Sequence, residues 1–306
     1  NYLVRNKIMK VSSKARIDKF VGFIFLLIGL ISSSTIIFIV TFVLIKGITP
    51  FFKDYGVDKV TIIDFLIGLN FDSHSYGVLG LVINTLFIVM IVSLIALPIS
   101  VLTSLFIVRI APKKIKVCMK MVIEMLSSIP SIIIGLFGMG VINPLVRDVA
   151  FSFNKQTAGG VSLLSVIIIL VIMIVPTITM ISITSMESIK NDQIEASIAL
   201  GATKSQTDYK IVIGSSKRGI FSGLILGVGR ALGEATAVSM VCGGNVGIAI
   251  SLFDPTSTLT SAMLSGIHES SGLNYDIRFS VAIVLMAVIF ITNLILNSIK
   301  KRIISN

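Results

Sequence analysis

Residues that commonly build metal, redox and disulfide sites are scarce in this sequence, whose 306 residues include two cysteines and two histidines. Cys118 and Cys242 stand alone and form neither a metal-binding nor a redox motif. His74 and His268 lie far apart and lack the spacing of metal ligands. We therefore expect no metal site in this chain.

Charged residues are also scarce. They make up 13% of the sequence, whereas hydrophobic residues make up 54%, and the mean hydropathy is +0.99. A soluble domain of this length does not need so much apolar surface for its core. The composition therefore predicts an integral membrane protein.

A nucleotide-binding loop of the pattern G-x-x-x-x-G-K-[ST] is missing from the sequence. Without that loop the chain cannot hold nucleotide phosphates by this route. We find no Ser, His and Asp set that can be placed on one side of a membrane. We therefore expect no enzymatic activity and no bound cofactor, and any ATP, with its magnesium, must be handled by a partner.

Six apolar runs are long enough to cross the roughly 30 Å of membrane hydrocarbon as helices of about 20 residues. The first run is too long for the core of a signal peptide, so we interpret it as a retained helix. The alternating pattern of transmembrane strands does not occur. The sequence thus predicts an all-α protein with six transmembrane helices. The runs occupy residues 20–46, 78–108, 119–142, 161–185, 217–242 and 276–299.

Basic residues are distributed unevenly among the segments that these runs separate. Arg230 stands near the middle of the fifth run, and most of the other 25 lysines and arginines belong to the set of segments that includes both termini. Because Lys and Arg near short loops resist translocation, we expect both termini on the cytoplasmic side of the membrane. We assign the net charge of +11 to this topology and to anionic lipid rather than to nucleic acid, since no nucleic-acid motif accompanies it. The opposite set of segments holds Lys46, Lys53, Lys59, Arg147, Lys155 and Arg278.

The connection 186–216 between the fourth and fifth runs has the pattern of a structured helical hairpin. Asp192 and Glu195 fit an acidic capping box, Gly201 suits a left-handed helix stop, and Thr203 with Gln206 repeats the capping pattern. The apolar side chains of this hairpin need a surface to cover. Packing under its own bundle and docking to another protein remain open alternatives at this point.

Arg230 is costly in the middle of a membrane span, at about 2.5 to 3.5 kcal/mol on insertion scales. Glu234 follows four residues later, so we expect the two side chains to share a helix face and offset each other. A buried ion pair that fixes the helix register is one interpretation. The other is a substrate path in which the guanidinium of Arg230 offers planar donors to a passing oxyanion and Glu234 keeps that anion from binding too tightly.

The hairpin resembles the EAA signature of ABC importer permeases, in which this loop contacts the cytoplasmic ATPase. The match runs from Glu195 and Ala196 through Gly201 to Ile211, and these four positions are the ATPase contacts that the resemblance implies. Two departures are visible, because Ser197 stands where a second alanine is usual and Ile213 with Gly214 replaces Leu-Pro.

The stretch GVGRALGEATAVSM at 227–240 resembles the corresponding span of phosphate-specific ABC permeases, the Pst family. Its methionine and the following 243–245 are more similar to the PstC subunit than to PstA. The pattern Glu124 to Gly135 and the stretch 76–98 extend the resemblance over most of the chain. The resemblance implies a permease of the MetI-like, type I fold, with Arg230 and Glu234 on the substrate path. We do not assign Glu124 to the path, since a salt bridge with Lys120 near the cytoplasmic interface suffices.

The resemblance also implies a division of the chain and a set of partners. Residues 1–19 are a cytoplasmic segment, 20–75 the first helix with an outer loop, 76–299 the permease core, and 300–306 a cytoplasmic tail. The partners are a PstA-type permease subunit, a PstB-type ATPase dimer and a PstS-type phosphate-binding protein that reaches the outer loops 47–77 and 243–275. The function implied is ATP-driven phosphate import by alternating access. Permeases for sulfate or molybdate and an ATPase-independent secondary transporter remain the alternatives.

Overall fold

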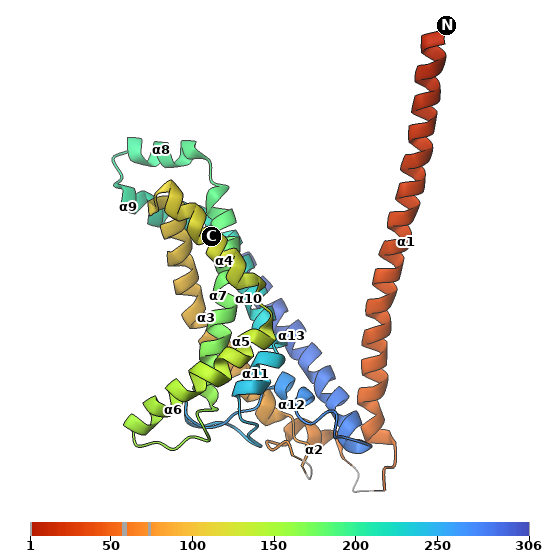
Figure 1. Cartoon of the computed structure of the whole chain (residues 1–306), viewed down its shortest axis with the longest axis vertical. Coiled ribbons are helices and arrows are strands. Elements are labelled where there is room, and N and C mark those ends of the chain that lie inside the picture. The colour runs from red at the N-terminus through yellow and green to blue at the C-terminus, as the bar shows by residue number, and fades with distance from the viewer. Residues whose placement is uncertain (1, 57–59, 73–74, 306) are drawn as a thin grey trace.

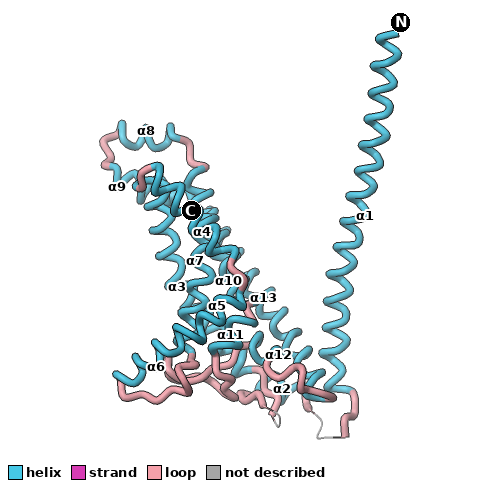
Figure 2. Tube along the Cα trace, in the orientation of Figure 1, coloured by secondary structure: helices cyan, strands magenta, loops and turns pink. Residues whose placement is uncertain are grey.

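The computed structural model describes residues 2–56, 60–72 and 75–305, with side chains for residues 18–56, 60–72 and 75–303. Within these ranges the chain is helical and has no strand beyond two isolated bridges. The predicted all-α fold is therefore confirmed (Figures 1 and 2). The helices are α1 (Tyr2–Phe52), α2 (Ile62–Ile67), α3 (Leu79–Leu105), α4 (Lys113–Ser128), α5 (Ser131–Phe137), α6 (Asn143–Ser152), α7 (Leu163–Glu187), α8 (Asn191–Ala199), α9 (Lys204–Thr207), α10 (Gly214–Gly233), α11 (Thr236–Val241), α12 (Leu259–Leu264) and α13 (Leu273–Ser305), with π-helical turns η1 (Phe106–Ile110), η2 (Gly138–Ile142) and η3 (Asp208–Ile213).

Six helical stretches of the described chain are long and apolar enough to cross a membrane, which agrees with the predicted number. Four of them begin and end close to the predicted runs, whereas the third and fifth differ. The stretches are Asp18–Phe52, Leu79–Ile110, Ser131–Ser152, Leu163–Glu187, Lys204–Gly233 and Leu273–Ile303.

The predicted third span, 119–142, is wrong because a break divides it. α4 ends at Ser128, and Ile129 is extended at φ −64° and ψ 127° before Pro130. Proline removes a backbone donor and pushes the residue before it out of the helical region, so the helix cannot continue. The apolar span starts after this break and runs through α5, η2 and α6.

The predicted fifth span, 217–242, is also divided. α10 ends at Gly233, Glu234 is extended at ψ 116°, and the short helix α11 begins at Thr236. The carboxylate Oε1 of Glu234 accepts a hydrogen bond from the backbone N–H of Ala237 at 3.0 Å. Glu234 therefore caps α11 and does not extend α10.

The two ends of the bundle carry different structures (Figure 1). We call the end with α8 and α9 the hairpin end, and the end with α2, α12 and the connection 243–258 the loop end. The start of α1 and the end of α13 both point toward the hairpin end. Lys59, His74 and the side chains of the basic residues before residue 18 lie outside the described parts of the chain.

α7 is the central helix, since 61% of its apolar window is buried, the largest share among the six spans. α3 and α10 flank it and contribute to the largest buried cluster, with Ile88, Ile174 and Val228 as members. Hydroxyls bind α3 to α7, because Ser100 and Ser104 donate to the carbonyl oxygens of residues 175 and 179, each at 3.1 Å. These bonds fix the register of the two central helices.

α1 stands apart from the bundle and meets α13 near the loop end (Figure 1). There Ser280 donates to the carbonyl oxygen of Gly47 at 2.6 Å, and the buried carboxylate of Asp276 accepts from Lys46 at 3.3 Å and from the Tyr55 hydroxyl at 2.6 Å. Burial and the neighbouring Asp276 carboxylate raise the pKa of Tyr55 to about 12. The phenol therefore remains protonated, and able to donate to Asp276, to a more alkaline pH than an ordinary tyrosine.

Candidate functional site

The connection between α7 and α10 folds as the predicted helical hairpin. Gly201 follows α8 with φ +87°, the left-handed conformation that glycine adopts without steric cost. Thr203 and Gln206 form the predicted capping box, with bonds of 3.2 and 2.9 Å. The capping box predicted for Asp192 and Glu195 is wrong, because α8 begins two residues earlier than that pattern requires. Its N-cap is residue 190, which makes no side-chain cap bond.

The hairpin both packs on its own bundle and faces outward. Ile194 packs against a buried cluster at the hairpin end, whereas Ile198, Leu200 and Tyr209 are 45%, 90% and 58% exposed. Of the four positions implied as ATPase contacts, three are exposed and the fourth is half-buried: Glu195, Ala196 and Gly201, and Ile211. An apolar edge therefore remains available to a partner after the hairpin has covered its own bundle.

Two polar contacts hold the hairpin in place. The hydroxyls of Ser197 and Thr207 lie 3.0 Å apart and join α8 to α9. Arg109 Nε donates to Asp208 Oδ1 at 2.6 Å and joins η1, at the end of α3, to η3. Ser197, which departs from the usual alanine, thus has a partner within the hairpin. The Arg109–Asp208 pair fixes the hairpin to the end of α3, through η1.

Arg230 lies in the last turn of α10 and is half-buried. Its Nη1 donates to the hydroxyl of Thr177 in α7 at 2.9 Å. The expected pairing with Glu234 is wrong, since none of the ion pairs in the described chain joins these two residues. An i, i+4 pair needs a continuous helix, and α10 ends at Gly233 between them. The carbonyl of Glu234 instead accepts from Thr260 of α12 at 2.8 Å.

α7 and α10 approach closely near Arg230, and glycine makes this possible. A Cβ at Gly227 would lie 2.9 Å from Ile178 Cγ1, and one at Gly223 would lie 3.3 Å from the Ile178 carbonyl oxygen. Gly223, Gly227 and Arg230 follow one another at helical spacing on the same side of α10. The thin glycine face therefore brings the Arg230 guanidinium to α7.

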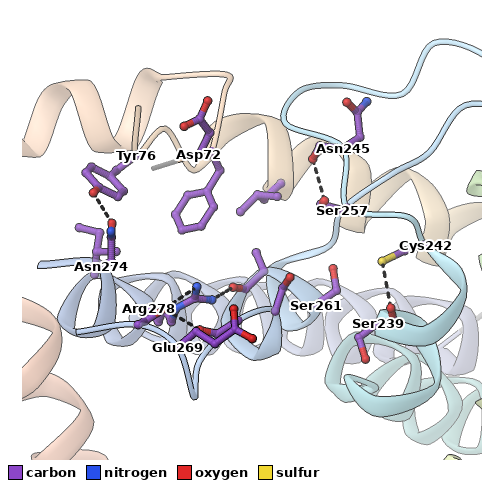
Figure 3. A pocket seen from close by; sticks show the side chains of 18 of the residues that line it. Asp72, Tyr76, Ser239, Cys242, Asn245, Ser257, Ser261, Glu269, Asn274 and Arg278 are labelled. Atoms are coloured by element: carbon purple, nitrogen blue, oxygen red, sulfur yellow. Dashed lines mark hydrogen bonds between the residues drawn. The ribbon is translucent and has the colours of Figure 1, made fainter. Parts of the chain in front are cut away.

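A polar cavity of about 700 Å³ lies at the loop end, between the connection after α11, the α12–α13 region and the stretch before α3 (Figure 3). Arg278 borders it and donates to the Ala262 carbonyl at 2.6 Å and to the Ser270 hydroxyl at 3.0 Å. Tyr76 donates to Asn274 across another side of the cavity, and burial with the nearby Asp72 carboxylate raises the pKa of Tyr76. The sequence did not indicate this hollow, because its hydroxyls and amides come from separate loops.

The cysteines, the potential metal ligands and Glu124 were also considered in the sequence. Cys118 is exposed and Cys242 buried, and both are free thiols. In the ranges that the structure describes, no three His, Cys, Asp or Glu side chains gather as metal ligands do, and His268 is exposed. The expected Lys120–Glu124 bridge is wrong. Lys120 instead pairs with Glu187 of α7 at 2.6 Å, and Lys116 binds the same carboxylate at 2.7 Å.

The comparison with protein families decides the class of this bundle. Residues 96–305 match the family described as binding-protein-dependent transport system inner membrane component. The chain belongs to this family. This inner membrane component family match covers the stretch from within α3 to α13 and includes both the hairpin and Arg230.

Curated relatives match this family member over most of their length. The probable ABC transporter permease protein YqgH of Bacillus subtilis is 31% identical over 280 residues, which cover 90% of this chain and 88% of that protein. The probable phosphate transport system permease protein PstC of Methanocaldococcus jannaschii is 30% identical, covering 84% and 87%. The phosphate transport system permease protein PstC of Pasteurella multocida is 29% identical, covering 75% and 77%.

Solved structures share the fold of this family member. A bacterial ABC transporter that imports the acidic polysaccharide alginate aligns with a TM-score of 0.63 at 16% identity, covering 94% of this chain and 99% of that chain. The MetNI methionine ABC transporter, in an inward-facing conformation, aligns with a TM-score of 0.53 at 19% identity, covering 74% and 94%. The predicted MetI-like permease fold is therefore confirmed.

Proposed function

We propose that this chain is a permease subunit of an ATP-driven importer that carries inorganic phosphate into the cell by alternating access. The observation that carries the proposal is the Arg230 guanidinium, which is half-buried inside the bundle and paired with no carboxylate in the described chain. A cation held in a membrane span usually faces a water-filled path or the bundle interior. Relatives named as phosphate permeases, at 28 to 30% identity over most of their length, support phosphate as the anion.

The chemistry of Arg230 suits a weakly held, passing oxyanion. A guanidinium presents planar donors that match two oxygens of a tetrahedral anion. Glu234, at the break between α10 and α11, would sit beside the anion as a fixed negative charge and shorten its stay. Arg230 and Glu234 remain the path residues of this proposal, although they do not pair with each other.

The hairpin would transmit the energy of ATP hydrolysis from the ATPase to the permease. Its exposed edge, with Leu200 and Tyr209 at the surface, offers an apolar contact for a PstB-type ATPase dimer, which would bind ATP and magnesium. This chain would hydrolyse nothing itself. A PstA-type permease subunit would complete the path, and a PstS-type phosphate-binding protein would dock at the loop end, where the described parts of 47–77 and 243–275 lie.

The proposed orientation of the chain in the membrane follows from the distribution of its basic residues. The hairpin end carries most of the basic residues, so we place it and both termini in the cytoplasm and the loop end outside a bacterial cell membrane. The cavity beside Arg278 then opens toward the side from which phosphate arrives.

The experiment is uptake of radiolabelled phosphate into proteoliposomes that contain the assembled complex and its loaded binding protein. We expect Arg230→Ala to lower ATP-driven uptake by roughly 10- to 100-fold, since hydrogen bonds to charged groups contribute about 1.5 to 3 kcal/mol. Arg218→Ala is the matched control, because Arg218 is exposed on the same helix. Normal uptake by assembled Arg230→Ala would contradict the path.

Other oxyanions are the second candidate, because Arg230 alone would accept sulfate or molybdate. Excess sulfate and molybdate should leave phosphate uptake unchanged. Strong competition by either anion would mean that phosphate is not the specific substrate, but the assignment as an ABC importer permease would stand. A secondary transporter would carry phosphate without ATP, so uptake in the absence of the ATPase subunits would favour that class instead.

A further inference from the structure

The hydroxyl of Thr177 is used differently from others on the membrane helices. Thr179 and Thr184 donate to the carbonyl oxygen four residues earlier, at 2.7 and 3.0 Å, which is the usual use of a helical hydroxyl. Thr85 does so at 2.6 Å while it also accepts a bond. Within the described residues Thr177 makes no such back-bond and only accepts from Arg230. Its own hydroxyl hydrogen is therefore uncommitted.

Arg230 has further N–H donors beside this hydroxyl. A guanidinium carries five N–H groups, and the described part of the chain engages one of them, at the 2.9 Å bond to Thr177. Both side chains are half-buried, so neither is sealed in the core. The pair thus presents several N–H donors and one O–H donor side by side.

The position of Thr177 is fixed from two sides. On the α3 side, Ser100 and Ser104 hold the α7 carbonyls two residues before and two residues after Thr177, each at 3.1 Å. On the α10 side, Gly227 packs against Ile178, the residue that follows Thr177. The backbone that carries Thr177 is therefore fixed, and its hydroxyl lies 2.9 Å from the guanidinium of Arg230.

We propose that Thr177 is a second residue of the oxyanion site, which accepts from Arg230 through a lone pair and donates its hydroxyl hydrogen to the tetrahedral anion that Arg230 holds. This inference rests on the proposed function and extends it to a residue on another helix. A tetrahedral oxyanion has enough acceptor oxygens to bind the guanidinium and the hydroxyl together. The hydroxyl adds a directed donor without adding charge, so it orients the bound anion without holding it too tightly for release.

The test compares Thr177→Val with Thr177→Ser in the assembled complex, using uptake of radiolabelled phosphate at saturating loaded binding protein. Valine keeps the shape and removes the hydroxyl, whereas serine keeps the hydroxyl. We expect Thr177→Val to lower uptake per ATP hydrolysed by roughly tenfold, as for one hydrogen bond to a charged group, and Thr177→Ser to stay within about twofold of wild type. Thr184→Val is the control, since Thr184 is exposed on the same helix and bonds its own backbone.

Three outcomes would overturn the inference. They are normal uptake by Thr177→Val, equal losses in Thr177→Val and Thr177→Ser, and an equal loss in Thr184→Val. A loss in Thr177→Val that is as large again in an Arg230→Ala background would also contradict it, because residues that act on one ligand are not additive.

A second measurement covers the case in which Thr177→Val fails to assemble. Thr177→Cys is made in a Cys118→Ser background, because Cys118 is exposed while Cys242 is buried. Inorganic phosphate should slow modification of the new thiol by a small charged thiol reagent, and chloride at equal ionic strength should not. Equal rates in phosphate and chloride, or a thiol that never reacts, would reject the site.

The failures of the two proposals can be told apart. Absence of phosphate uptake by the wild-type complex, or normal uptake by Arg230→Ala, refutes the proposed function. Phosphate uptake that depends on Arg230 but is unaffected by Thr177→Val refutes only the role of Thr177.

Discussion

The Arg109–Asp208 ion pair should set how tightly the hairpin holds an ATPase subunit. The two charged atoms lie 2.6 Å apart, and the side chains are 25% and 13% exposed. A charge-assisted hydrogen bond with this burial contributes about 2 kcal/mol, and removing one partner leaves the other charge partly buried. The pair joins η3 to η1, so its loss loosens the hairpin against α3, where the apolar cluster around Leu105 and Val212 still holds it.

A loosened hairpin must be ordered again when the ATPase binds, which lowers the affinity for the ATPase by at most as much as the lost bond supplied. We therefore expect Asp208→Ala to weaken ATPase binding by up to about 30-fold, which corresponds to 2 kcal/mol. Arg109→Ala should cost a similar amount, and the double variant should cost less than the sum of the two.

The assay is a titration of the purified ATPase subunit onto the permease complex in lipid nanodiscs. Asp148→Ala is the matched control, because Arg147 and Asp148 also form a bond, at 2.9 Å, but are 55% and 67% exposed. Pairs so exposed contribute about 0 to 1 kcal/mol. A change of less than about threefold for Asp208→Ala, or an equal change for Asp148→Ala, would refute the reasoning.

Three further predictions follow from the backbone and from Tyr55. Gly201→Val should weaken ATPase binding, measured by the same titration, because φ +87° costs a β-branched residue about 1 to 2 kcal/mol; Gly201→Asn should cost less. Gly227→Val should lower the melting temperature of the purified complex, because its Cβ would meet Ile178 at 2.9 Å; Gly229→Ala, with open space around it, is the control. Because the folded pKa of Tyr55, about 12, exceeds the ordinary value of 10.0, its contribution to stability is fully present below pH 10 and is lost as the pH rises through about 12. A spectroscopic titration of wild type against Tyr55→Phe measures this, and ionisation of Tyr55 near pH 10 would contradict it.

The number of spans and the hairpin could be predicted from the sequence because both depend on local patterns. Apolar runs report membrane helices directly, and the Thr203–Gln206 capping box and Gly201 involve residues at most three positions apart. The hairpin's hydrophobic residues predicted that it covers a surface, but they left open whether that surface belongs to its own bundle or to another protein. None of these features needed knowledge of a distant contact.

The breaks and the surroundings of Arg230 could not be predicted in this way. Glu234 ends α10 and caps α11, and its carbonyl binds Thr260, which is 26 residues away. Helical spacing alone therefore suggested a pair with Arg230 that the fold does not form. Thr177 lies 53 residues from Arg230, and only the packing of α7 on α10 brings the two together.

The isolation of α1 has a consequence for how this sequence changes over evolutionary time. α1 meets α13 near the loop end, and Phe51 is the one residue of its described side chains that packs against a buried cluster. Most substitutions along the rest of α1 therefore meet no fitted neighbour within this chain, so we expect selection by the chain's own packing to act there on apolarity and length. The family match begins only at residue 96, beyond α1. We therefore expect α1 to diverge faster among relatives than the bundle that follows it.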